Sequence, residues 1–159
     1  MTFTVGNIWF KVAESEWELE AYFNLRRCVF VEEQKAFASS DVDEYDDGAL
    51  HLVAVEEDSG KVVGGVRCYR KEGDLWFGGR LCVEQQYRAS HVGSNLVRLA
   101  VASVKAAGCK QFLAYIQTQN VRFFEKRGWH SLGAPIMYHG FLHQLMEADL
   151  ATAEATMSV

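Results

Sequence analysis

The sequence lacks any long apolar segment. No run of about 18 apolar residues occurs in the 159 residues, and the first residues, MTFTVGNIWFKVAESE, contain no basic stretch followed by an apolar one. A membrane-spanning helix needs about 20 apolar residues, and a signal peptide needs both of those regions. We therefore expect a soluble, cytoplasmic protein that does not interact with a membrane.

Clusters of basic residues and paired cysteines are missing as well. The net charge is −5, and Lys and Arg occur in ones and twos, whereas a nucleic-acid-binding surface needs them clustered. The four cysteines form no CxxC pair and have no histidine at the spacing of a zinc site. We therefore expect neither a nucleic-acid partner nor a metal, and we expect the cysteines to be reduced.

The acidic residues are concentrated in one segment, SSDVDEYDDG, at residues 39–48. A calcium-binding loop does not fit this segment, because neither the required glycine nor the closing glutamate falls in register. The segment could attract a cationic substrate or form a solvated loop, and composition favours the solvated loop.

Composition and periodicity predict one mixed domain over residues 1–150. The hydrophobic content of 49% suits a single core, and ATAEATMSV at residues 151–159 has no pattern and reads as a flexible tail. A strand is expected over residues 5–12. Ser15 and Glu18 form a capping box that opens a helix running towards Glu32. After the acidic segment, LHLVAVEE, KVVGGVRCYR and LWFGGRLCVE form an antiparallel meander with turns at DSG and KEGD.

The second half of the sequence has alternating helix and strand patterns. A helix begins near Gly93 and stops at Gly108, followed by the strand QFLAYIQ and the short helix VRFFEKR. WHSLG and FLHQLMEADL read as two more strands, with APIMYHG between them. The fold class we predict is α/β (α+β), with a mixed, mostly antiparallel sheet of six to seven strands and helices on both faces. Pairing should become parallel at the last strand of the meander.

The segment QYRASHVGSNLVRLAV, at residues 86–101, joins the meander to the following helix. The first N–H groups of a helix have no intrahelical acceptor and carry partial positive charge, so they can hold a pyrophosphate. Arg88 would add a charge-assisted contact or brace the loop. Neither the Walker pattern nor the dinucleotide-binding fingerprint is present.

Four motifs follow one another in a particular order: Leu81-Cys82-Val83 at a strand end, RASHVGS, FLAYIQTQN and NVRFFEKRGW. This order resembles the GNAT superfamily of acyl-CoA-dependent N-acetyltransferases. The front half, LRRCVFVEEQ to GKVVGGVRCYR, resembles its ElaA-like branch and, more distantly, acyl-homoserine-lactone synthases. The resemblance covers nearly the whole chain. It implies that an acetyl group passes from acetyl-CoA to a primary amine of a small molecule, by direct attack in a ternary complex.

The resemblance also implies the cofactor-binding residues. Pantetheine would pair with the strand end, pyrophosphate would bind the loop amides, and the short helix would flank the pantetheine arm. His91 replaces the middle glycine of the loop; its imidazole lies over a phosphate or is simply exposed, and exposure is favoured. The implied residues are Leu81, Cys82, Val83, Arg88, Ala89, Ser90, His91, Val92, Gly93, Ser94, Asn120 and Phe124.

Two catalytic features of the family are absent. Phe124 stands where a tyrosine usually protonates the thiolate, and the meander's last strand carries WFGG without the usual glutamate. We expect Glu33 as general base and Tyr138 as general acid, with Glu32 and Asp46 as further candidates for the base.

The residues expected to contact the acceptor are Glu32, Asp46, Arg67 and Arg80. The two arginines lie on apolar strands, where burial demands a partner. That partner is either a substrate carboxylate or an aspartate, Asp43 or Asp46, and the aspartate is favoured.

Alternatives to this function remain open. Cys82 could carry the acyl group as a nucleophile, although direct transfer is favoured. The missing tyrosine and glutamate suggest a non-catalytic acyl-CoA-binding module as the second function, and synthase chemistry is a weaker third. Family members are often dimers, so a homodimer is possible.

Overall fold

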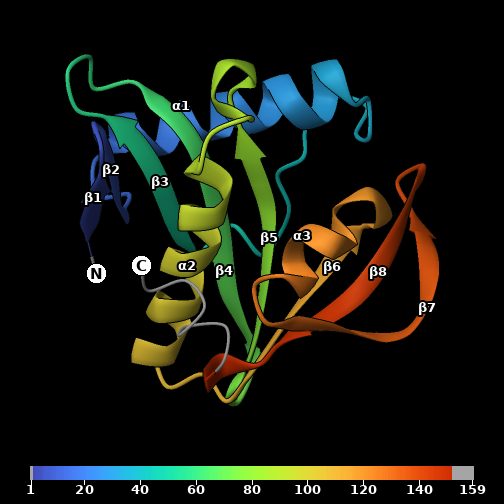
Figure 1. Ribbon diagram of the computed structural model, residues 1–159. Coiled ribbons are helices and arrows are strands. Elements are labelled where there is room, and N and C mark those ends of the chain that lie inside the picture. The colour runs from blue at the N-terminus through green and yellow to red at the C-terminus, as the bar shows by residue number, and fades with distance from the viewer. Residues whose placement is uncertain (1, 152–159) are drawn as a thin grey trace.

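The computed structural model describes residues 2–151 and places every strand in one eight-stranded sheet (Figure 1). The sheet order is β1-β2-β3-β4-β5-β6-β8-β7, and all neighbours pair antiparallel except β5 and β6, which are parallel. The strands are β1 Phe3–Val5, β2 Ile8–Val12, β3 Leu50–Glu56, β4 Val62–Glu72, β5 Leu75–Val83, β6 Gln111–Gln117, β7 Trp129–Tyr138 and β8 Phe141–Ala148.

The predicted fold class, the meander and the switch to parallel pairing after it are confirmed, while the strand number is eight rather than six to seven.

The helices are α1 Glu16–Arg26, the π-helix η1 Arg27–Glu33, the short 3-10 helices η2 Gln85–Tyr87 and η3 Thr118–Asn120, α2 Val92–Ala106 and α3 Val121–Glu125. No helix among residues 2–151 is both long and apolar enough to cross a membrane. Apart from Ala151, the tail expected at 151–159 lies outside the described residues.

Helices cover both faces of the sheet, with α2 in front of it and α1 behind it in Figure 1. Neighbouring glycines on β4 show this arrangement, because successive residues of a strand point to opposite faces. A Cβ atom added at Gly64 would meet Leu96 and Val92 of α2, whereas one added at Gly65 would overlap the ring of Tyr22 on α1. Both glycines are therefore required for close packing of a helix on the sheet.

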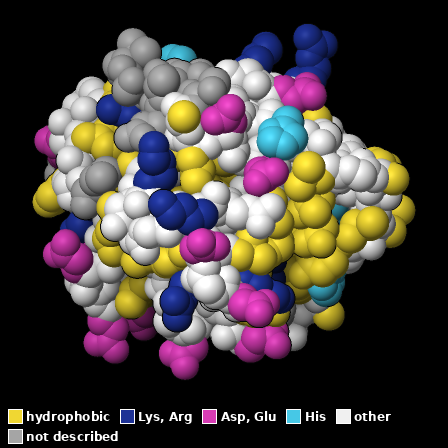
Figure 2. Space-filling model, turned by 90° about the horizontal axis from the view of Figure 1, so that it is seen from below, with side chains coloured by type: hydrophobic (Ala, Val, Ile, Leu, Met, Phe, Trp, Pro, Cys, Tyr) yellow, Lys and Arg dark blue, Asp and Glu magenta, His cyan; other side chains and the backbone are white. Residues whose placement is uncertain are grey.

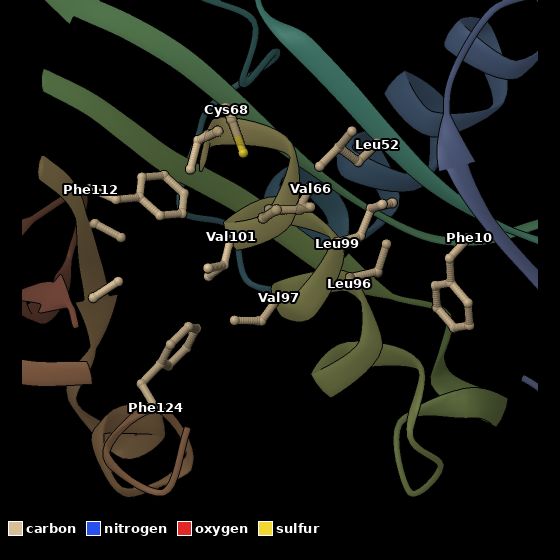
Figure 3. Close-up of a cluster of buried hydrophobic side chains, with 14 of the residues drawn as sticks. Phe10, Leu52, Val66, Cys68, Leu96, Val97, Leu99, Val101, Phe112 and Phe124 are labelled. Carbon is tan, nitrogen blue, oxygen red and sulfur yellow. The ribbon is translucent and has the colours of Figure 1, made fainter. Parts of the chain in front are cut away.

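The main core lies between α2 and the sheet (Figure 3). Val97, Val101 and Val104 come from one face of α2 because residues three and four apart share a face of a helix. They belong to one core cluster with strand residues such as Phe10 and Phe112, and all five side chains are buried. Each apolar side chain buried in this way contributes roughly 1.5–3 kcal/mol to folding.

The capping box at the start of α1 is formed as predicted. Ser15 Oγ accepts the N–H of Glu18 at 3.1 Å, and Glu18 Oε1 accepts the N–H of Ser15 at 3.1 Å. The helix continues past Arg26 as η1, so helical structure reaches Glu33.

Two strand predictions are wrong in detail. Residues 3–12 form a hairpin rather than a single strand, since Gly6 takes a left-handed conformation with φ of 60° and reverses the chain. The segment APIMY is part of β7, because Ile136, Met137 and Tyr138 pair with residues 143, 142 and 141 of β8 beyond a bulge. An edge strand tolerates the proline of this segment.

Candidate active site

Strands β5 and β6 separate part-way along their length. They pair only between Leu75–Gly78 and Gln111–Ala114, and no pairing joins them beyond that point within residues 2–151. β5 bulges at Arg80, whose φ is 52°, and the hydroxyl of Tyr22 on α1 donates to the carbonyl of Arg80 at 3.0 Å. A bulge bends its strand. The end of β5 at residues 81–83 therefore presents an edge that β6 does not cover.

A cavity of about 490 Å³ opens where these strands separate. It is bounded by the sheet on the side of α1, by the segment after η1, by the acidic segment and by the turn between β7 and β8. Its lining includes Gln34, Phe37, Asp43, Tyr45, Arg67, Tyr69, Lys71, Phe77, Arg80, Leu81, Tyr115, Ile116, Gln117, Asn120, Phe124, Tyr138, His139 and His143. This volume is typical of a small-molecule site.

A row of four aromatic rings forms one wall of the cavity. Successive centroids of Tyr45, Tyr69, Phe77 and Tyr115 lie 4.3, 6.0 and 6.1 Å apart, and every pair is stacked. Lys71 Nζ donates to Tyr45 Oη at 2.9 Å and lies 5.9 Å from the centroid of Phe77. Our sequence reasoning missed this wall, because the rings come from the acidic segment and three different strands, and their alignment depends on strand register.

The acidic segment folds around a buried arginine. Arg26 has no exposed surface, and its guanidinium contacts Asp41 Oδ2 through Nε at 2.7 Å and Asp46 Oδ1 through Nη1 at 2.7 Å. Asp41 is 2% exposed and Asp46 is 9% exposed. The favoured interpretation of a solvated loop is therefore wrong for these two aspartates. The reason is that Arg26, on α1, supplies the charge that makes their burial favourable.

Arg67 and Arg80 also pair with the acidic segment, as the favoured alternative predicted. Arg67 contacts Asp43 at 2.5 and 2.9 Å, and Arg80 contacts Asp41 at 3.0 Å and Asp43 at 3.3 Å. Asp43 also accepts the N–H of Tyr45 at 3.0 Å, so both of its oxygens are occupied. Three arginines and three aspartates thus balance in charge, and both cavity-lining arginines are already paired.

Asp46 is held in its charged form. Burial alone would raise the pKa of Asp46, but hydrogen bonds and charge from Arg26 lower this pKa well below its usual value. Asp46 does not line the cavity. A carboxylate with so low a pKa is a poor proton acceptor near neutral pH.

Glu33 and Glu32 lie outside the cavity lining as well. Glu33 forms two contacts with Arg88, at 2.7 and 2.8 Å, and these hydrogen bonds lower its pKa. Glu32 is exposed and contacts Arg27 at 3.6 Å. The structure therefore brings none of the three carboxylates that we considered as a general base to the cavity.

The loop before α2 is braced by Arg88. Besides its contacts with Glu33, Arg88 Nε donates to the carbonyl oxygen of Val83 at 2.9 Å. Among residues 2–151, no backbone acceptor is recorded for the N–H groups of Ala89, His91, Gly93 and Ser94. These four N–H groups, in the loop before α2 and in the first turn of this 15-residue helix, form a suitable cradle for an anion.

Gly93 occupies the first turn of α2 and faces the end of β5. A Cβ atom added there would lie 3.8 Å from Val83 and 3.9 Å from Phe123, which are ordinary contact distances. His91 is exposed, as favoured from the sequence, and precedes α2 without capping it through its side chain. Val92 is buried in the core, and Ser90 Oγ accepts its N–H at 3.3 Å.

The other predicted cofactor residues lie around the separated strands. Leu81, Asn120 and Phe124 line the cavity. Cys82 is not part of the cavity lining and is buried in the small core beneath α1, where burial raises the pKa of its thiol. A buried thiol with a raised pKa carries little thiolate, so the geometry does not support Cys82 as a nucleophile.

Tyr138 lines the cavity from the end of β7, together with His139 and His143. Figure 2 shows apolar side chains gathered on the right of the view, the side on which β7 and β8 lie in Figure 1. Ile136, Met137, Tyr138 and Leu142 of these two strands are exposed. Within residues 2–151, no group of three or more His, Cys, Asp or Glu side chains is arranged to hold a metal ion.

Comparison with known proteins identifies the family. Residues 12–129 match the model of the Acetyltransferase (GNAT) family. The protein belongs to this family. The uncharacterised N-acetyltransferase YjcF of Bacillus subtilis is 32% identical to this GNAT protein over 123 residues, which are 76% of this chain and 84% of YjcF.

Solved structures share the GNAT fold. The crystal structure of Escherichia coli ElaA has a TM-score of 0.78 at 19% identity, covering 94% of this chain and 100% of ElaA. The CoA-dependent acyl-homoserine lactone synthase BjaI, solved with SAM and isopentyl-CoA, has a TM-score of 0.74 at 23% identity, covering 89% of this chain and 81% of BjaI. The resemblance to the GNAT superfamily and to ElaA is thereby confirmed.

Proposed function

We propose that this GNAT protein transfers the acetyl group of acetyl-CoA to the primary amine of a small molecule, by direct attack in a ternary complex. The observation that carries the proposal is the separation of β5 from β6 beyond Gly78. The separated strand end leads from the four unpaired N–H groups before and within α2 to the cavity. Family membership supports the use of acyl-CoA.

The cofactor would be held mainly by backbone groups. The N–H groups of the loop from Arg88 to Ser94 would bind the pyrophosphate, and residues 81–83 would pair with pantetheine through the uncovered edge of β5. A backbone N–H in that strand end would polarise the thioester carbonyl. Asn120 and Phe124, which line the cavity, would flank the pantetheine arm.

The acceptor would occupy the cavity on the α1 side of the sheet. The aromatic wall provides an apolar surface, and Lys71 and Tyr138 add polar groups. Direct transfer needs the amine and the thioester close together and the amine deprotonated. Tyr138 would protonate the departing thiolate, because Phe124 has no hydroxyl group for this step.

Binding of acetyl-CoA is tested by thermal unfolding. At about one hundred times the dissociation constant, a ligand adds roughly 2.7 kcal/mol, which raises the melting temperature by about 5–10 °C for a chain of this size. Gly93→Glu should abolish the rise, since it puts a bulky negative group at the start of α2. Gly93→Ala is the matched control and should retain most of it, because its Cβ atom meets only ordinary contacts. No rise with the native protein would contradict the proposal.

A non-catalytic acyl-CoA-binding module is the second candidate. The observation that favours it is the absence of Glu32, Glu33 and Asp46 from the cavity lining. Release of free thiol from acetyl-CoA should be followed with a panel of polyamines, amino acids, arylalkylamines and a basic peptide. Release with at least one acceptor supports the transferase, while binding without release supports the module.

A further inference from the structure

We propose that His143 is the general base of this site, a role that rests on the transferase function proposed above. The cavity requires a base that is not a carboxylate. Among residues 2–151, Asp43 is the one acidic side chain in its lining, and the oxygens of Asp43 accept hydrogen bonds from Arg67, Arg80 and the backbone of Tyr45. Deprotonation of an ammonium substrate must therefore depend on a neutral group.

The hydrogen bonding of His143 determines which of its nitrogens is free. Nδ1 lies 2.8 Å from the carbonyl oxygen of Phe141. A carbonyl oxygen can only accept, so Nδ1 carries the hydrogen, and the neutral ring then has an unprotonated Nε2. This nitrogen has no recorded partner within residues 2–151, and it is not among the fully enclosed polar atoms. His143 thus presents a lone pair that solvent and substrate can reach.

The imidazole is rigidly placed at the separated end of β6. His143 is 8% exposed, and it lies opposite Gln117 in the pairing of β6 with β8. Cross-strand partners share one face of a sheet, so His143 and Gln117 both face the side on which the cavity lies. Ile116 and Gln117 line the cavity there as well, beyond the last residues of β6 that pair with β5. This is the region where the thioester would lie.

The other two histidines near the acceptor region are less suited to this role. His139 is exposed in the turn after β7, and its ring centroid lies 4.1 Å from that of Phe37, with the two rings tilted by 32°. His51 is buried outside the cavity lining, and its Nε2 lies 3.0 Å from the carbonyl oxygen of Asp46. The ring of Tyr138 contacts that of His143 edge-on at 5.3 Å. The remaining titratable or charged groups of the cavity are Asp43, Tyr45, Arg67, Tyr69, Lys71, Arg80, Tyr115 and His139.

The chemical step balances with His143 as proton acceptor. The substrate enters as an ammonium, and Nε2 removes one proton, which exposes the nitrogen lone pair. The nitrogen attacks the thioester carbonyl carbon, a C–N bond forms, and the C–S bond breaks with its electron pair passing to sulfur. The nitrogen then loses its second proton, and the thiolate gains one, so that an amide, a free thiol and one protonated imidazole result.

His143→Asn tests the assignment while preserving the local structure, because the Asn side-chain amide can still donate to Phe141 but provides no base. We expect kcat/KM for any accepted amine to fall about 10²–10⁴-fold, the usual contribution of a general base. The acid limb of the pH–rate profile should disappear, and the melting-temperature rise with acetyl-CoA should be unchanged. His130→Asn is the control, because His130 is exposed on β7 outside the cavity lining, and it should change kcat/KM less than threefold. An H143N variant that keeps its rate and its pH profile would overturn the assignment.

Two measurements remain informative if no amine is accepted. The slow hydrolysis of acetyl-CoA uses water in place of the amine, so native protein should exceed H143N in this reaction; equal rates would count against the base. Nitrogen-15 NMR of the histidine rings, with His143 identified by its loss in H143N, should show hydrogen on Nδ1. Hydrogen on Nε2 instead would refute the assignment. Failure of the native protein to bind acetyl-CoA is a separate result, which would contradict the proposed function itself.

Discussion

Arg26 of α1 and Asp46 of the acidic segment form a two-point ion pair in the interior, with Nη1 to Oδ1 at 2.7 Å and Nη2 to Oδ2 at 2.9 Å. Arg26 has no exposed surface. The pair joins the first helix to the segment that carries Asp43 and Tyr45 into the cavity. It therefore connects the packing of α1 on the sheet with the shape of the acceptor region.

Asp46→Asn should lower the free energy of unfolding by about 3 kcal/mol, because Arg26 then keeps a buried charge with one carboxylate partner fewer. This loss of unfolding free energy is at the low end of the range for breaking a buried ion pair, because Asp41 still contacts Arg26 in the variant. Urea unfolding measures the change. Asp47→Asn is the matched control, because Asp47 is exposed, and it should alter stability by less than about 0.5 kcal/mol. Equal stabilities of the two variants would contradict the role of the pair.

Acid should remove the stabilisation that Asp46 provides. Burial raises the pKa of Asp46 in the folded protein, but the hydrogen bonds and charge of Arg26 outweigh burial and lower this pKa below its usual value. The unfolded chain therefore binds the proton more tightly than the folded protein does. The contribution is fully present above the unfolded pKa of about 4 and is lost as the pH falls from there through the folded pKa. The difference in unfolding free energy between native protein and D46N should be constant from pH 7 to 5 and shrink below pH 4. A constant difference down to pH 2 would argue against this linkage.

Gly65→Ala should destabilise the protein by about 1–3 kcal/mol, since the added methyl group would overlap the buried ring of Tyr22. Displacement of Tyr22 would also weaken its hydrogen bond to the carbonyl of Arg80 at the β5 bulge. Gly79→Ala is the control, because a Cβ atom at Gly79 meets nothing within 4 Å. Thermal unfolding of the two variants measures the contrast, and similar melting temperatures would show that α1 can move away from the sheet at little cost.

Glu33→Gln should weaken acetyl-CoA binding by no more than about fivefold, as expected for an exposed ion pair that braces a loop. Its pH–rate profile should match that of the native protein, because Glu33 does not line the cavity. Isothermal titration and thiol-release kinetics measure the two effects. Glu32→Gln should affect neither. Loss of the acid limb of the profile in E33Q would restore Glu33 as the general base expected from the sequence.

Much of the scaffold follows from local patterns in the sequence. Ser15 and Glu18 predict the start of α1, because a capping box involves residues only three positions apart. Turn residues between apolar runs predict the meander, and the order of the motifs around Leu81, Gly93 and Asn120 indicates the GNAT family. These features depend on near neighbours in the chain, so the sequence by itself determined them.

Contacts between distant segments were decided by the tertiary structure. The burial of the acidic segment depends on Arg26 lying across it, and the aromatic wall depends on the register of three strands. The access of the cavity to the free nitrogen of His143 depends on the separation of β6 from β5, whereas the carbonyl that binds the other nitrogen belongs to Phe141 of the same strand. A side chain's charge, exposure and hydrogen-bond partners depend on the residues that surround it in space. In this protein those residues come from distant segments, which only the folded sheet brings together.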